Sequence, residues 1–178
     1  MPKGVYLFFM QARTDYIQLV DTLSLSPHPE GGYYREVYRH RVEINSCCLP
    51  KNMEGKRNYL TSIYFLLPHG EFSAFHKIKQ DEVWYFHEGS PLMIHMIDPN
   101  GLYSKIKLGV VDDNYGVYQF TVPANVWFAA ECIEENSFSL VSCAVAPGFD
   151  FNDFLLADRA QLIQEYPEHA DLITRLSS

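Results

Sequence analysis

From residue 32 onward, hydrophobic and polar residues alternate in short runs, and turn residues separate one run from the next. β-Branched and aromatic side chains are frequent in these runs, which is typical of strands with one face on a core. The pattern predicts strands over residues 32–39, 59–67, 72–78, 82–88, 91–97, 102–108, 116–122 and 137–146. DPNG at 98–101 predicts a turn, because Pro99 presets its own φ angle and Gly101 accepts a positive one.

Near the N-terminus, apolar residues recur at helical spacing over residues 14–23: Tyr16, Ile17, Val20 and Leu23. This spacing predicts one short amphipathic helix, with Thr14 or Asp15 available as its cap. Residues 1–13 are interpreted as an N-terminal extension, ordered only where it packs on a neighbour. Its apolar stretch GVYLFFM is too short to span a bilayer and makes a poor signal peptide, and Met10 is an alternative natural start.

The C-terminal part of the chain changes pattern after Pro147 and Gly148. Helical spacing there predicts two segments over residues 157–166 and 168–176, which Pro167 separates. A helix, about eight strands and two further helices follow one another without a repeat or linker. This order predicts one domain of the all-β class, a sandwich or barrel such as a jelly roll, with flanking helices.

Composition and charge narrow the class of protein further. The 178 residues are 47% hydrophobic and 15% aromatic, as expected of a folded globular chain. The formal net charge of −8 argues against nucleic acid or a membrane surface as a partner. The cysteines, at positions 47, 48, 132 and 143, fit neither a zinc finger nor a disulfide framework, so we expect reduced thiols in a cytoplasmic protein.

One stretch, GEFSAFHKIKQDEVWYFHEG, has the spacing of a metal site with a ligand missing. His76 follows Gly70 after five residues, and Gly89 follows Glu82 after six. Side chains two positions apart on a strand share a face. A second histidine would therefore be expected at the position of Ile78.

These residues resemble the first motif of the cupin superfamily, which has a glycine, an H-x-H pair, a glutamate and a second glycine at this spacing. The second cupin motif is matched loosely by Gly116 and Pro123, while Phe128 stands where that motif has a metal-binding histidine. The resemblance implies that Ile78 and Phe128 replace two of the four usual metal ligands.

The flanking sequence is similar to the Cupin_5 family of small single-domain cupins. The matching segments are HPEGGYYRE at 28–36, YFLLP at 64–68, FSAFHKIKQDEVW at 72–84, VPANVWFAAE at 122–131 and APGFDFNDF at 146–154. The resemblance covers about residues 16–176 and implies a jelly-roll barrel within a single cupin domain over residues 14–178. It implies no particular reaction, because a fold does not fix its chemistry.

The resemblance places His76 and Glu82 inside the barrel, where three interpretations stay open. The favoured one is a histidine–glutamate pair lining a polar pocket without a cofactor. The second is a weakly bound divalent metal on these two residues, since metal sites usually need at least three protein ligands. The third recruits a substitute ligand such as His95 or Cys143.

The aromatic and aliphatic residues near the motifs predict a pocket for a small organic ligand. Its candidate lining residues are Ile78, Trp84, Trp127 and Phe128, of which the last two are alternatively plain core. In HPEGGYYRE, Gly31 and Gly32 predict a close backbone approach. Tyr34 and Arg35 are further candidates; Arg35 would hold a carboxylate or phosphate, or alternatively pair with an acid on an edge strand.

Two classes of function remain. The first is a binding module for a small metabolite. The second is a metal-independent isomerase or epimerase for a sugar-like substrate or a keto or hydroxy acid, with His76 as base and Glu82 as its orienting group. In that case Tyr34 or Tyr64 would act as the acid.

The N-terminal half also predicts a homodimer. The stretch HPEGGYYREVYRHRVEI concentrates Tyr33, Tyr34 and Tyr38 on a candidate edge strand, and exposed edges are commonly covered or paired. The resemblance implies the same, because cupins commonly pair through an N-terminal strand.

A surface loop is predicted over residues 45–57, which are rich in turn-forming residues: Asn45, Pro50, Asn52 and Gly55.

Overall fold

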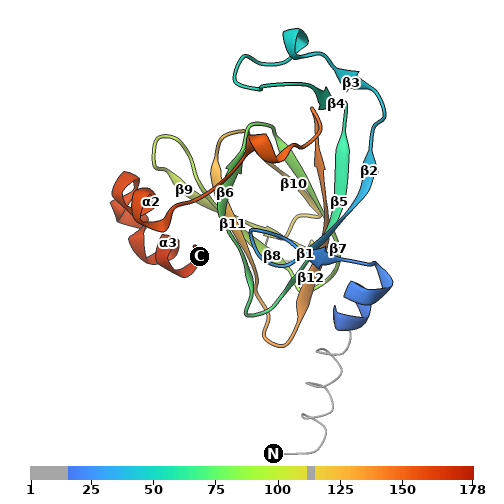
Figure 1. The fold of residues 1–178 in the computed structure, drawn as a ribbon. Coiled ribbons are helices and arrows are strands. Elements are labelled where there is room, and N and C mark those ends of the chain that lie inside the picture. The colour runs from blue at the N-terminus through green and yellow to red at the C-terminus, as the bar shows by residue number, and fades with distance from the viewer. Residues whose placement is uncertain (1–15, 112–114) are drawn as a thin grey trace, which may run out of the picture.

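Two antiparallel sheets face each other and enclose the core (Figure 1). The computed structural model describes residues 16–111 and 115–178. The first sheet consists, in spatial order, of β1 (Ser26–Pro27), β2 (Tyr33–Arg39), β5 (Thr61–Pro68), β12 (Phe138–Val145), β7 (Glu82–Gly89) and β10 (Gln119–Val122). The second consists of β13 (Phe154–Leu156), β6 (Phe72–Ile78), β11 (Trp127–Cys132), β8 (Leu92–Ile97) and β9 (Tyr103–Leu108). This open sandwich is a jelly roll, as the sequence predicts.

All eight predicted strands are present, although the one predicted over 116–122 begins only at Gln119. The predicted turn is also confirmed, because the Gly101 N–H donates to the Asp98 carbonyl oxygen at 2.9 Å and Gly101 has a φ of 82°. The prediction omitted β11. This strand lies inside its sheet, between β6 and β8, and is buried on both faces, so it shows no polar alternation.

The two C-terminal helices cover the outer face of the second sheet (Figure 1). The Asp158 side chain accepts from the Gln161 N–H and caps α2 (Arg159–Glu165). The 3-10 turn η3 (Pro167–His169) then leads into α3 (Ala170–Arg175). Their apolar side chains pack on Phe75, Ile97, Trp127 and Ala129 of the sheet. Within the described residues, no helix is long and apolar enough to cross a bilayer.

The first described residues, 16–22, are helical and pack on the outer face of the first sheet. Tyr16, Val20 and Leu23 contact the cluster of Leu25, Leu66 and Leu140, as predicted. The prediction was wrong for Ile17. Its side chain is 49% exposed, and Leu19 packs on the cluster instead. The proposed caps, Thr14 and Asp15, and the extension 1–13 lie outside the described residues.

The segment between β2 and β5 is not simply the exposed loop that was predicted. It contains β3 (Glu43–Ile44), the 3-10 turn η1 (Ser46–Cys48) and β4 (Arg57–Asn58), and the last of these pairs with β3. Met53 and Arg57 are buried, at 6% and 3% exposure. Their burial fixes this segment against one end of the sandwich.

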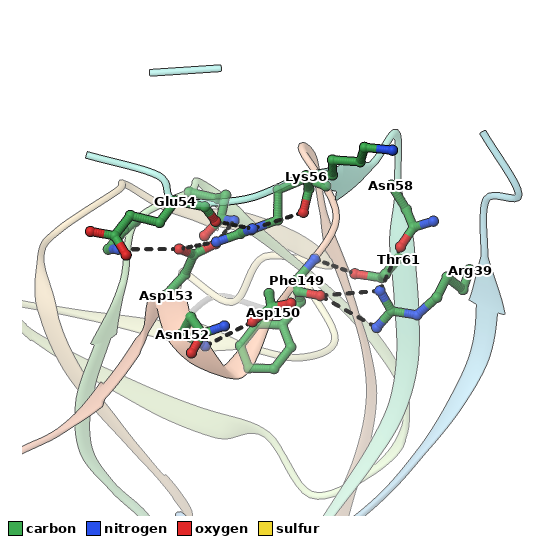
Figure 2. A network of polar contacts seen from close by, with 12 residues as sticks. Arg39, Glu54, Lys56, Asn58, Thr61, Phe149, Asp150, Asn152 and Asp153 are labelled. Atoms are coloured by element: carbon green, nitrogen blue, oxygen red, sulfur yellow. Dashed lines mark hydrogen bonds and ion pairs between the residues drawn. The ribbon is translucent and has the colours of Figure 1, made fainter. Parts of the chain in front are cut away.

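Arg57 is held by a buried ion pair with Asp153, whose side chain is labelled in Figure 2. Its Nε and Nη2 donate to the two carboxylate oxygens at 2.6 and 2.7 Å, and its Nη1 donates to the carbonyl oxygens of Glu54 and Lys56. Gln80 adds a further bond to Asp153 at 2.7 Å. Burial opposes ionisation of Asp153, but the bonds from Arg57 and Gln80 outweigh it and lower its pKa. The pair joins the β3–β4 segment to the 3-10 turn η2 (Phe151–Asp153).

Removal of one partner of this ion pair should strongly destabilise the fold. Asp153→Ala leaves the Arg57 guanidinium buried and unpaired, which costs about 3–5 kcal/mol of unfolding free energy. Urea denaturation measures the loss. Glu43→Ala is the matched control, because it breaks the exposed Lys56–Glu43 pair and should cost less than about 1 kcal/mol. Equal losses for the two variants would contradict the structural role of the buried pair.

Candidate functional site

A cavity of about 370 Å³ lies between the sheets. Its walls come mainly from β2, β5, β6, β7 and β12, together with the residues that precede β2 and those around η2. Titratable residues in its lining are His28, Glu30, Glu36, Arg39, Tyr34, His76, Glu82, Cys143 and Asp150. Four of them, His28, Glu30, His76 and Glu82, are here called the His/Glu cluster.

His76 projects from β6 into this cavity and is only 2% exposed. Its Nδ1 lies 2.7 Å from the Ala74 carbonyl oxygen. Since a carbonyl oxygen can only accept, Nδ1 carries a proton and Nε2 is the nitrogen left to exchange one. Burial lowers the pKa of His76, so the ring favours its neutral form. The Phe128 ring lies against it, at 4.0 Å between centroids.

The Nε2 atom of His76 lies 3.2 Å from Oε2 of Glu30. The same carboxylate oxygen is 3.4 Å from Nδ1 of His28, and the Ser73 hydroxyl donates to Oε1 at 2.9 Å. Burial is the main cause that raises the pKa of Glu30, against the smaller effects of His28 and Ser73. A carboxyl group that favours protonation beside a neutral imidazole can share one proton with it.

The two glycines of HPEGG position Glu30. Gly31 has a φ of 110°, and a Cβ there would lie 2.1 Å from the Phe72 carbonyl oxygen. Glycine therefore lets this segment lie directly against β6, where the Ala74 N–H donates to the Glu30 carbonyl oxygen at 2.8 Å. The close approach predicted for Gly31 and Gly32 brings Glu30 to His76.

His28 completes this side of the cluster. The backbone N–H of Glu30 points at its Nδ1 at 3.3 Å, so that nitrogen acts as an acceptor. Burial lowers the pKa of His28, although Glu30 opposes this effect. The Tyr34 ring meets the imidazole edge-on, at 4.5 Å between centroids.

Glu82 projects from β7 into the same cavity and is 8% exposed. Burial, followed by the charge of Glu30, raises its pKa to about 7, while His76 has a smaller lowering effect. Burial likewise raises the pKa of the neighbouring Cys143 thiol well above its usual value, so this thiol stays protonated. The Glu82 carboxyl is therefore balanced between its two protonation states near neutral pH.

The expected direct pairing of His76 with Glu82 is only partly right. Both side chains face one cavity, but the ion-pair partner of His76 Nε2 is Glu30. Sequence reasoning missed Glu30, His28 and Ser73 as members of this site. The glycine pair in HPEGG was the available signal, because it showed that the preceding residues approach another strand closely.

Only some of the predicted site residues line the cavity. Tyr34, Ile78 and Trp84 line the cavity, and Phe128 lies in the core behind His76. Phe128 is therefore not part of the lining, in line with its alternative interpretation as core. Three further residues are absent from the lining, which corrects the prediction: Arg35 and Trp127 as ligand contacts and Tyr64 as the catalytic acid.

Strand alternation explains these three corrections. Arg35 follows the inward-facing Tyr34 and so points to the opposite face of β2. Tyr64 points to the outer face of β5, where it packs near Leu66 and lies 6.0 Å from the His87 ring. Trp127 faces the C-terminal helices, with Lys77 Nζ 4.3 Å from the centre of its ring.

The described residues do not fit the metal centre that the cupin resemblance implies. No three of their His, Cys, Asp or Glu side chains are placed to hold one metal ion. His95 is no substitute ligand, because it lies outside the cavity and contacts Tyr103 at 2.8 Å and Glu131 at 3.0 Å. Cys143 does line the cavity, but as a buried thiol that favours its protonated form.

A two-sheet jelly roll with a cavity on the strands of the G-H-E-G motif defines a cupin. Residues 17–157 match the profile of Cupin_5, described as "Cupin superfamily (DUF985)", and the chain belongs to this family.

Uncharacterised proteins are among its relatives. An uncharacterized protein of Saccharomyces cerevisiae, YML079W, is 30% identical over 148 residues, which are 76% of this chain and 72% of that protein. The crystal structure of protein SO0799 from Shewanella oneidensis has a TM-score of 0.82 at 38% identity, and covers 90% of this chain and 96% of its own. A hypothetical protein from Leishmania major has a TM-score of 0.79 at 34% identity, with 89% and 96% covered.

Replacement of Glu82 by glutamine should stabilise the fold at neutral and alkaline pH. The folded state raises the pKa of Glu82 from 4.5 to about 7 by burial, so wild-type stability falls as the pH rises through this window. One pKa unit corresponds to about 1.4 kcal/mol, so Glu82→Gln should gain roughly 3 kcal/mol above the window and little below it.

Urea denaturation at a series of pH values measures this difference between the two proteins. Glu88→Gln is the matched control, because Glu88 is exposed on the same strand and should change stability little at any pH. A gain for Glu82→Gln that does not depend on pH would refute the raised pKa.

Proposed function

We propose that this chain is a small-molecule-binding cupin whose ligand occupies the cavity around His76 and Glu82. The observation that carries the proposal is the His/Glu cluster itself, buried in a cavity of about 370 Å³ with largely aromatic and aliphatic walls. Buried carboxyl groups without full ion pairs destabilise a fold. Their presence in a ligand-sized cavity supports a role in binding, without a resident cofactor.

A variant that fills the cavity should abolish binding. Ile63 lines the cavity from β5, so Ile63→Trp should occupy the ligand's volume and lower affinity at least about tenfold, since it displaces contacts made only in the pocket. Native mass spectrometry of the freshly purified protein identifies the ligand, and calorimetry measures its affinity.

Tyr64→Phe is the control. Tyr64 follows Ile63 on the same strand, but its side chain faces the outer side of the sheet, so this change should leave affinity unchanged. If Ile63→Trp folds and binds the ligand as tightly as the wild type, the cavity is not the binding site.

A metal-independent isomerase or epimerase is the second candidate, and the geometry around His76 supports it. The bond of Nδ1 to Ala74 leaves Nε2 as the atom that could take a proton from a substrate carbon. Glu82, with a pKa raised to about 7 by burial, could return one. The Ala74 carbonyl oxygen takes the orienting role first assigned to Glu82, because it binds Nδ1, whereas Glu30 faces the reactive Nε2 and could exchange a proton with it. Tyr34 replaces Tyr64 as the tyrosine in reach. A neutral sugar-like substrate suits these carboxyl groups better than a keto or hydroxy acid.

The same ligand distinguishes the two candidates when the variant Glu30→Gln is compared with the wild type. Loss of proton exchange between ligand and solvent, with affinity kept, supports the enzyme. Loss of affinity in a protein that never exchanges ligand protons supports the binding module. Exchange is followed by NMR in deuterated water.

We also propose a homodimer that forms along β2. One side of β2 pairs with β5 throughout, but on its other side β1 reaches only Tyr33 and Tyr34 among the described residues. Val37, Tyr38, Val42 and Tyr59 are exposed apolar side chains on β2 and the nearby β3–β4 segment. A second copy would cover both this open edge and these side chains.

Tyr38→Asp should shift the protein toward monomer, because it places a charge in the proposed interface. Sedimentation at micromolar concentration should show a wild-type dimer, with a buried area of at least about 1,200 Å² in total. Leu102→Asp, at an exposed turn elsewhere, is the control and should stay dimeric. A wild-type species of 20.6 kDa would end the proposal.

A further inference from the structure

The His/Glu cluster is rich in hydrogen-bond acceptors and poor in free donors. Glu30 Oε2 and His76 Nε2 face each other, and His28 Nδ1 already accepts from a backbone N–H. The nearby Ser73 hydroxyl is a donor, and its bond to Glu30 uses it. A ligand that contacts these residues meets mainly acceptors, so one that supplies donors is favoured here.

The permanent cation of the cavity lining is not available to an anionic ligand. Arg39 directs all its N–H groups at protein acceptors, and Figure 2 shows its bonds to Phe149. The Glu36 carboxylate accepts from Nε and Nη2 at 2.9 and 2.7 Å, and Asn58 Oδ1 accepts from Nη1 at 2.8 Å. The Phe149 carbonyl oxygen accepts from Nη1 and Nη2 at 3.3 Å. With Arg39 and Glu36 neutralising each other, the remaining carboxyl groups of the lining are Glu30, Glu82 and Asp150.

The walls of the cavity suit a cation. Its aromatic lining residues are Tyr34, Phe65, Trp84, Phe149, Phe151 and Phe154. Ring faces attract positive charge, most strongly in desolvated sites. The Trp84 Nε1–H is buried and has no acceptor among the described residues, and the indole favours the ionised form of the adjacent Glu82.

We propose that the cavity binds a small organic molecule that carries a protonated amine, with the ammonium group against Glu30 and Glu82. This inference rests on the proposed binding function and names the chemical class of its ligand. The ammonium group supplies the donors that the cluster lacks and the positive charge that its carboxyl groups lack. The aromatic walls contact the apolar part of the ligand and add attraction to its charge.

The protonation of Glu82 links this binding to pH. A cation favours the ionised carboxylate, so Glu82, whose pKa burial raises to about 7, releases a proton when the amine binds. Affinity therefore rises with pH. The other titratable groups that share the cavity with Glu82 are His28 and Glu30 before β2, Tyr34 and Glu36 on β2, His76 on β6, Cys143 on β12 and Asp150 before η2. Loss of a proton from any neighbouring group makes the cavity more negative, which also favours a bound cation. Arg39 keeps its charge throughout.

Three probes with one carbon skeleton test the charge requirement: cyclohexylmethylamine, cyclohexylmethanol and cyclohexanecarboxylate. Calorimetry on the purified full chain should show the amine binding at least about tenfold more tightly than the alcohol, with no carboxylate binding. The amine stays protonated, since alkylamines have a pKa of about 10. Its affinity should rise about tenfold from about pH 6 to about pH 8, as release of one proton near pH 7 requires.

Glu82→Gln should weaken the pH dependence around pH 7 and reduce amine affinity toward that of the alcohol, while Glu88→Gln should leave both unchanged. Glu30→Gln serves as a second variant of the cluster and should also weaken the amine. If the alcohol or the carboxylate binds the wild type as tightly as the amine or more tightly, and Ile63→Trp blocks that binding, the inference is overturned. The proposed binding function would then still stand. Failure of all three probes to bind at millimolar concentration would overturn the inference, and the cavity-filling test above then decides the binding function separately.

Discussion

The burial of Glu30 and Glu82 in one apolar cavity is the constraint on which the site depends. Each carboxyl group loses hydration, and the charge of Glu30 further raises the free energy of ionising Glu82. Neither has a lysine or arginine partner in the cavity, because Arg39 is bonded to Glu36. The protein therefore keeps protons in this cluster that exposed glutamates would release. The raised pKa of Glu30 beside the neutral His76 is a direct consequence of this desolvation, and the proposed preference for a cationic ligand rests on the same two carboxyl groups.

Ile78 and Phe128, which stand where the cupin motifs have histidines, also shape this environment. Phe128 is the register partner of His76 across β6 and β11, so a ring covers the imidazole where a second histidine would otherwise approach. Ile78 contributes an aliphatic wall to the cavity. Glu30 then takes the position beside His76 Nε2, carried there by a segment whose glycines allow contact with β6. The jelly roll thus keeps the spacing of the motif, while its interior places a neutral histidine beside a carboxyl group whose pKa burial raises.

Sequence patterns predicted most of the fold because strands with one polar face alternate visibly. β11 escaped detection since both of its faces are buried, and Arg57 was assigned to a loop because its partner, Asp153, is distant in the chain. For the site, motif spacing identified His76, Glu82 and Ile78, which line one cavity. It could not identify Glu30, whose approach to His76 depends on the path of a loop. Motif spacing also does not show which of two consecutive residues on a strand points inward. On β2 this residue is Tyr34, which lines the cavity, and on β5 it is Ile63, so Tyr64 points outward.

Titration of carboxyl-labelled glutamate by NMR tests the central claim most directly. Comparison with Glu82→Gln assigns the resonance of Glu82. If burial beside Glu30 sets the properties of the cavity, this resonance should titrate with a pKa of about 7, well above the value of about 4.3 that glutamate has in short peptides. A Glu82 resonance that titrates with the exposed glutamates would contradict the desolvated cluster and the proton-linked binding that follows from it.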